Sequence, residues 1–67
     1  MIKINNSYFK IEIIESIIFV QDDDGSNTLC VVLNKPFIDN YNKYIVKGLT
    51  KQQAYRLSNE IDEQLRG

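Results

Sequence analysis

Apolar and polar residues alternate over several short segments of this chain, and a period of two residues is typical of a β-strand with one buried face. Residues 1–4 place Ile2 and Ile4 on one face and Lys3 on the other. The same alternation returns at residues 43–47. We therefore predict a strand at each of these places.

A longer apolar segment, residues 8–21, begins with this alternation and then loses it near Glu15 and Ser16. Two interpretations are open. Either the segment is a strand that bulges or kinks at this point and continues as a second strand, or the part from Ile11 to Ile18 contains a single helical turn. Because β-branched side chains pack well on sheets and lose rotamer freedom in helices, the kinked strand is favoured.

A polar stretch, residues 22–27, separates this segment from the next one. It contains Gly25, which accepts a positive φ, and aspartates whose side chains bond the local backbone, so it predicts a reverse turn between paired strands. Residues 28–33 are apolar on both faces, with Cys30 and Val32 on one of them. This pattern indicates an interior strand that is covered on one face by a helix, with a second subunit as a candidate cover for the other.

The start of a C-terminal helix is marked by Thr50. This residue is placed to accept a hydrogen bond from the Gln53 backbone while the Gln53 side chain returns to the Thr50 amide, and Leu49 is placed to pack on Ala54. From residue 51 the apolar residues follow helical spacing and form one stripe: Ala54, Leu57, Ile61 and Leu65.

These elements predict the fold class α+β in a single domain, residues 1–67. The expected architecture is a small antiparallel sheet of about three to five strands with one C-terminal amphipathic helix packed on one face. A chain of 67 residues buries only about 60% of its unfolded surface on folding. Domains of this size usually gain stability from disulfides, metals or self-association.

The cysteine and histidine content argues against the first two of these sources of stability. Cys30 is the only cysteine and the chain has no histidine. An internal disulfide is therefore impossible, and a zinc site would lack its usual ligands. We expect a homo-oligomer, a dimer or larger.

The charge balance limits the classes of partner. Eight Lys and Arg residues against nine Asp and Glu residues give a formal net charge of −1, without the basic excess of proteins that bind nucleic acid polymers. The longest apolar run is too short to span a bilayer, and residues 1–5 lead into polar residues rather than the apolar segment of a secretion signal. We expect a cytoplasmic protein that binds neither nucleic acid polymers nor membranes.

The candidates for enzymatic chemistry are few. Cys30 lies inside an apolar strand, and no histidine is present to activate its thiol. The aspartates at 22–24 lack the spacing of a calcium loop, since the twelfth position counted from Asp22 is Leu33. We expect a protein that is not an enzyme and that holds no metal and no cofactor.

The helix start is the candidate anion site. Unbonded backbone amides and the positive end of a helix dipole favour a phosphate or carboxylate, although ordinary capping also explains a threonine at this position. The candidate ligand-binding residues combine positive charge, the cap and rings that can stack on bases: Lys47, Thr50, Lys51, Arg56, Tyr44 and Tyr55. The polar loop carries a candidate interface, because aromatic and apolar side chains are enriched at interface centres: Phe37, Ile38 and Tyr41.

The layout as a whole resembles the very small anti-defence and host-inhibitor proteins encoded by phages and mobile elements. The resemblance rests on a few antiparallel strands, the Asp22-Asp23-Asp24-Gly25 turn and one C-terminal amphipathic helix. It implies a non-enzymatic protein that acts by occupancy. One hypothesis is an oligomer that antagonises a host defence system by sequestering a nucleotide signal molecule. The alternative is a protein-protein inhibitor or adaptor that presents a sheet edge or the 34–42 loop to a host enzyme.

Overall fold

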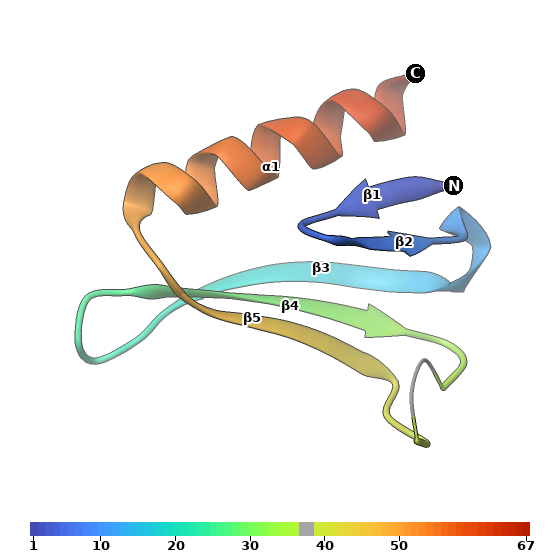
Figure 1. The fold of residues 1–67 in the computed structure, drawn as a ribbon, viewed down its shortest axis with the longest axis horizontal. Helices are drawn as coiled ribbons and strands as arrows, with labels where there is room; N and C mark the ends of the chain where they lie inside the picture. The colour runs from blue at the N-terminus through green and yellow to red at the C-terminus, as the bar shows by residue number, and fades with distance from the viewer. Residues whose placement is uncertain (37–38) are drawn as a thin grey trace.

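The fold of the chain is seen in a computed structural model that describes residues 1–36 and 39–67 (Figure 1). The elements follow one another as β1 (Ile2–Ile4), β2 (Ser7–Phe9), a 3-10 helical turn (Ile11–Ile13), β3 (Ile14–Gln21), β4 (Asn27–Leu33), β5 (Lys43–Leu49) and α1 (Lys51–Arg66). The strands form a two-stranded sheet, β1-β2, and a three-stranded sheet in the order β3-β4-β5, and all pairings are antiparallel.

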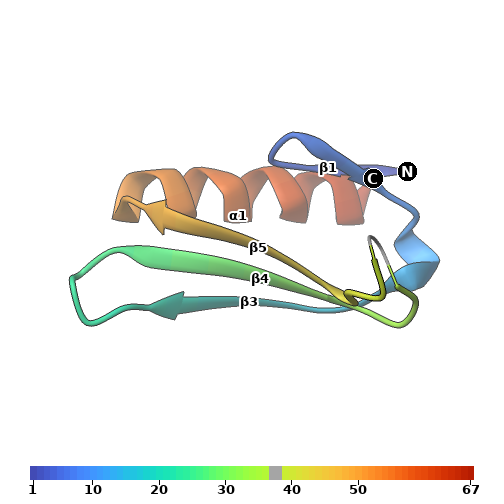
Figure 2. The same ribbon diagram turned by 60° about the horizontal axis from the view of Figure 1, so that its bottom comes forward.

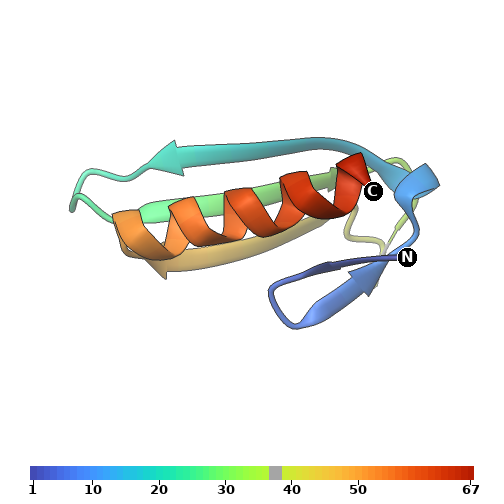
Figure 3. The same cartoon turned by 90° about the horizontal axis from the view of Figure 1, so that it is seen from above.

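The molecule has two layers. The three-stranded sheet forms one layer, and α1 and the β1-β2 hairpin together form the other (Figure 2). Seen from above, the hairpin lies beside α1 on the side of β5, whereas β3 lies on the opposite side of α1 (Figure 3). The predicted α+β class, with a C-terminal helix on one face of an antiparallel sheet, is confirmed.

One hydrophobic core fills the space between the layers. Its buried residues come from both layers: Ile2, Ile4, Phe9, Leu29, Val31, Leu33, Leu49 and Ile61. The two faces of β4 differ as the sequence indicates, because Leu29, Val31 and Leu33 are buried while Cys30 and Val32 are only half-buried. The helix layer therefore covers one face of the three-stranded sheet, and none of the described elements covers the other face.

The ambiguous segment contains both features that the sequence offered as alternatives. The predicted strand through Ile13 is wrong, because β2 ends at Phe9 and a 3-10 turn follows at Ile11–Ile13. The predicted bulge is present, since the pairing of β3 with β4 shifts register between Ile14 and Ser16. The turn carries the chain from the hairpin in one layer to β3 in the other, a change of layer that a continuous strand would not allow (Figure 1).

The predicted reverse turn joins β3 to β4. Its backbone closes by a hydrogen bond from the Asp22 amide to the Ser26 carbonyl (2.8 Å) and another from the Gly25 amide to the Asp22 carbonyl (3.0 Å). Gly25 has a φ of 87°, a conformation that glycine adopts without steric cost. The turn thus pairs the long strands β3 and β4 directly.

Candidate functional site

The helix start forms the predicted capping box. The Thr50 hydroxyl accepts a hydrogen bond from the Gln53 amide (3.1 Å), and the Thr50 amide donates to the Gln53 side-chain oxygen (2.9 Å). Leu49 is buried and Ala54 packs against the same core, as expected for the hydrophobic contact that accompanies such a cap. Capping therefore engages the Thr50 hydroxyl, and anion binding at this helix start stays a prediction.

The positive candidate residues do not converge on one point. Lys51 and Arg56 are both exposed on α1, but they are five positions apart, which at about 100° per residue places them about 140° apart around the helix. Lys47 is exposed near the end of β5, on the strand before the helix. Lys51 and Arg56 of one chain therefore point in different directions from α1 and do not converge on one phosphate.

The two tyrosines proposed for base stacking have different environments. Tyr44 is half-buried in β5, and its ring meets the Phe9 ring edge-to-face with centroids 5.3 Å apart and planes at 61°. Its hydroxyl accepts a hydrogen bond from the Asn5 side-chain amide (3.3 Å). Tyr44 thus holds the hairpin to the sheet, whereas Tyr55 is 70% exposed on α1.

Of the candidate interface residues, only Tyr41 can be placed. Its side chain is 70% exposed in the segment between β4 and β5. Phe37 and Ile38 lie outside the described residues.

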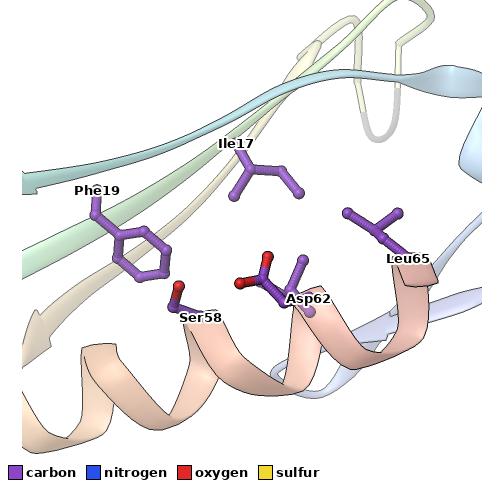
Figure 4. Close-up of a pocket in the computed structure, with 6 residues that line it drawn as sticks. Ile17, Phe19, Ser58, Asp62 and Leu65 are labelled. Carbon is purple, nitrogen blue, oxygen red and sulfur yellow. The ribbon is translucent and has the colours of Figure 1, made fainter.

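A groove between β3 and α1 is the concave site that the sequence did not predict. Its volume is about 190 Å³, and it is lined by apolar side chains together with two polar ones: Ile17, Phe19, Ile61 and Leu65, with Ser58 and Asp62. Figure 4 shows the Ser58 hydroxyl and the Asp62 carboxylate directed from the helix toward β3. The groove remains open because the hairpin fills the space beside α1 only on the side of β5 (Figure 3).

The signal for the groove was present in the apolar stripe of the helix. Leu65, the last member of that stripe, is half exposed rather than buried, since no described strand reaches over it. Ile17 and Phe19 supply the opposite wall from the strand whose phase was ambiguous. The stripe therefore predicted the apolar surface of the helix correctly but not which part of it the sheet leaves open.

The edge of β3 that faces away from β4 borders this groove, and no described strand pairs with it. Residues 16–21 of this edge contain no charged residue, no proline and no glycine. Natural edge strands usually carry charged residues, proline or a bulge, which prevent pairing with another chain. In β3, Glu15 and the bulge lie before residue 16 and leave the rest of the edge without such a feature. We call residues 16–21 the open edge of β3.

The surroundings of the open edge are acidic. No lysine or arginine occurs between Lys10 and Lys35. The same part of the chain contains five acidic residues: Glu12, Glu15, Asp22, Asp23 and Asp24. Positive charge lies mainly on the other elements, with Lys43 and Lys47 on β5.

Within residues 1–36 and 39–67, no group of three or more His, Cys, Asp or Glu side chains is placed to hold a metal ion. In the same described ranges, no helix has the length and apolar character needed to cross a bilayer. No protein family, curated protein or solved structure matches this chain.

Proposed function

We propose that this protein is a non-enzymatic binding protein that acts by occupying a partner protein, and that it adds an extended segment of the partner to the open edge of β3. This is the inhibitor or adaptor role that the sequence offered as the alternative. The observation that carries the proposal is an edge of six residues, 16–21, that has no charged side chain, pairs with no described strand and lies directly beside the groove.

Strand addition explains why the edge and the groove occur together. An added strand lies about 4.8 Å from β3 and bonds its backbone amides and carbonyls, while its side chains point alternately to the two faces of the sheet. One set of side chains is directed to the face that carries α1, where the groove lies between Phe19 and Leu65. Backbone hydrogen bonds then supply affinity, and the groove supplies selectivity.

The charges around the edge define the chemistry of the partner segment. The groove contains the Asp62 carboxylate among apolar side chains, and the β3-β4 hairpin carries acidic residues without a basic one. Attraction between opposite charges raises the rate of association, and repulsion between like charges suppresses acidic partners. The partner segment is therefore extended, aliphatic at alternate positions, and basic rather than acidic.

A synthetic peptide tests this proposal. The probe is a peptide of about nine residues, the length of a long strand, in which valine and threonine alternate and lysine occupies one end. Binding is followed by fluorescence anisotropy. We expect saturable binding that weakens at least about tenfold in Leu65→Glu and in Asp62→Lys, because truncating or reversing central contacts has effects of this size. Tyr55→Ala, on an exposed part of the same helix, is the control and should bind as the wild type does.

The decisive comparison uses the same peptide with alternate backbone amides methylated. Methylation removes the donors on one edge and leaves the side chains in place, so strand addition requires a large loss of affinity. Equal affinity of the two peptides, or unchanged binding by Leu65→Glu and Asp62→Lys, overturns the proposed function.

Antagonism of a host defence system and sequestration of a nucleotide signal stay predictions from the sequence. Because Lys51 and Arg56 diverge on α1, a phosphate pocket of this composition requires residues from more than one chain. Thermal unfolding in the presence of linear and cyclic nucleotides tests the hypothesis, since a ligand at about 100 times its dissociation constant adds about 2.7 kcal/mol to the native state. A rise in Tm that is lost in Lys51→Glu supports it, and an unchanged Tm across the panel counts against it.

A further inference from the structure

The face of the three-stranded sheet that points away from α1 is apolar and has no cover within the described residues (Figure 2). Its apolar residues come from all three strands: Ile18, Val20, Cys30, Val32 and Ile45. We call these residues the outer face. Ile18, Val20 and Ile45 are 45%, 49% and 50% exposed. Ile18, Cys30 and Ile45 are direct cross-strand neighbours, so they form one row across the middle of the sheet.

The area of the outer face limits how tightly a partner can bind there. Strands about 4.8 Å apart with a rise of about 3.4 Å per residue give a flat area of about 340 Å² for three strands of seven residues. This is comparable to the largest apolar patches on monomers, which are often functional. It is smaller than the roughly 800 Å² per partner of a standard interface. The face therefore suits a weak, reversible association.

Two bulges place charges at opposite rims of the outer face. Ile14 and Ile17 both pack against the core, so Glu15 and Ser16, the two residues between them, lie on the outer side. In β5, Val46 and Leu49 contact the core. Lys47 and Gly48 between those two residues therefore also lie on the outer side. The rim along β3 is acidic and the rim along β5 is basic.

The cross-strand register aligns these charges with one another. Ser16 pairs with Val32, and Val32 pairs with Lys43, so Glu15 and Lys43 lie at the same level on opposite rims. Lys47 lies at the other end of β5, near the level where β3 runs into Asp22.

This distribution selects one way of stacking two copies face to face. A two-fold axis in the interface and perpendicular to the strands would place β3 over β3, with acid against acid. An axis parallel to β4 places β3 of each copy over β5 of the other, with acid against base. Like charges in contact cost free energy and disfavour the first arrangement, whereas the second arrangement pairs opposite charges, so the axis parallel to β4 is favoured.

We propose that a second copy of this chain packs on the outer face about a two-fold axis parallel to β4. Ile18 then faces Ile45 of the second copy, Cys30 faces Cys30, and Glu15 faces Lys43. The sheets align within about 30° and lie about 10 Å apart, as in two-layered β-proteins. Because the interface is isologous, each contact off the axis occurs twice, whereas Cys30 meets its own copy once, on the axis.

The dimer leaves the open edge of β3 accessible in both copies. In this arrangement the two open edges lie at opposite sides of the assembly, each stacked on β5 of the other copy. The grooves lie on the α1 side of each sheet, which points away from the dimer interface. A dimer of this kind presents two binding edges, so it gains avidity for a partner that is itself oligomeric.

Sedimentation equilibrium of the whole chain over micromolar concentrations tests the proposal. We expect a reversible dimer and a dissociation constant that rises at least about tenfold in Ile45→Lys, because this side chain lies in the central row. Tyr55→Lys is the matched control, since Tyr55 is exposed on α1, and it should dimerise as the wild type does. Far-UV circular dichroism and Tm confirm that both variants fold.

A charge exchange tests the axis itself. Lys43→Glu and Glu15→Lys should each weaken the dimer, and the double variant should recover most of the loss, because the reversed pair is again complementary. A chain that stays monomeric at every concentration overturns the proposal, as does a dimer that Ile45→Lys leaves intact. A double variant as weak as the sum of the two single variants overturns the parallel axis. Peptide binding at β3 does not need the dimer, so monomeric Ile45→Lys should retain it, and the two proposals can fail separately.

Discussion

The side-chain amide of Gln64 forms two hydrogen bonds with the backbone of Lys3, one to its amide and one to its carbonyl. The Lys3 amide donates to Gln64 Oε1 (2.7 Å), and Gln64 Nε2 donates to the Lys3 carbonyl (2.6 Å). A neighbouring strand would make the same pair of hydrogen bonds. Gln64 therefore takes the place of a neighbouring strand along the edge of β1 that faces the helix. It thereby joins two segments that are 61 positions apart in the sequence.

Replacement of Gln64 should therefore lower the free energy of unfolding. Each hydrogen bond of this kind contributes about 0.5–1.5 kcal/mol, so we expect Gln64→Ala to cost about 1–2 kcal/mol in chemical denaturation. Gln64→Glu should also destabilise, because it keeps the acceptor and places a carboxylate oxygen against the Lys3 carbonyl. Gln52→Ala, at an exposed helix position, serves as the control. Equal stability of wild type and Gln64→Ala would contradict this role.

Gly48 should resist substitution for a backbone reason. Its φ is 74°, and it lies at the bulge where the register of β4 with β5 shifts between Asn27 and Leu29. A Cβ at Gly48 would meet no atom within 4 Å, so the cost arises from the left-handed conformation and not from a clash. We expect Gly48→Ala to lower the free energy of unfolding by about 1–2 kcal/mol.

Gly48→Asn provides the comparison for that measurement. Asparagine adopts positive φ more readily than alanine does, so it should destabilise less. If the two variants were equally stable, or if Gly48→Ala unfolded at the same denaturant concentration as the wild type, the conformational explanation would fail.

The sequence predicted those elements whose signals are local. Thr50 and Gln53 are three positions apart and form their capping box within one turn, so the beginning of α1 could be predicted from the chain alone. The alternation at residues 43–47 predicted a strand there, and in β5 Tyr44 and Val46 are half-buried while Ile45 between them is exposed. In each case the information lies within a few residues of the element that it defines.

The features that the sequence missed depend on segments far apart in the chain. The helical turn at Ile11–Ile13 was only the less favoured of two interpretations, because no local pattern indicates that β2 and β3 belong to different layers. The groove depends on the hairpin lying on the β5 side of α1 and leaving Leu65 half exposed on the other. The candidate ligand residues were grouped by proximity in sequence, but helical geometry directs Lys51 and Arg56 to different sides of α1.

The stability of the β3-β4 turn should depend on pH through the Asp24 carboxylate. The Ser26 hydroxyl donates to Asp24 Oδ1 (2.7 Å) and the Ser26 amide donates to the same oxygen (2.9 Å). These two bonds hold the pKa of Asp24 below its ordinary value, and the bond from the Ser26 hydroxyl has the larger effect. Because the folded-state pKa is lowered, ionised Asp24 stabilises the fold above the unfolded-state pKa of about 3.9. That contribution is lost as the pH falls through the lowered folded-state value.

Ser26→Ala should raise the pKa of Asp24 part of the way toward its ordinary value, because the hydroxyl is lost and the amide remains. Carboxyl carbon shifts in an NMR titration measure this directly. Ser26→Thr keeps the hydroxyl and should keep the lowered pKa. The stability difference between wild type and Ser26→Ala should also shrink in acid, where Asp24 is protonated in both. An Asp24 titration that is identical in wild type and Ser26→Ala would refute the assignment.

The contact between Phe9 and Tyr44 should couple the hairpin to the three-stranded sheet. The two rings meet edge-to-face with centroids 5.3 Å apart, and such pairs contribute about 0.5–1.5 kcal/mol beyond the area they bury. In a double-mutant cycle with Phe9→Leu and Tyr44→Leu, we expect the two losses of unfolding free energy to be non-additive by about that amount. A second cycle with Phe9→Leu and Leu57→Ala, whose residues share the core but lie in different elements, supplies the control. Additive losses for Phe9 and Tyr44 would mean that the ring contact contributes nothing beyond the separate burial of the two side chains. The hydrogen bonds of Gln64 act on β1, and the ring contact of Phe9 acts on β2. Removing the Gln64 and Phe9 side chains together should therefore release the hairpin from the sheet before the rest of the molecule unfolds.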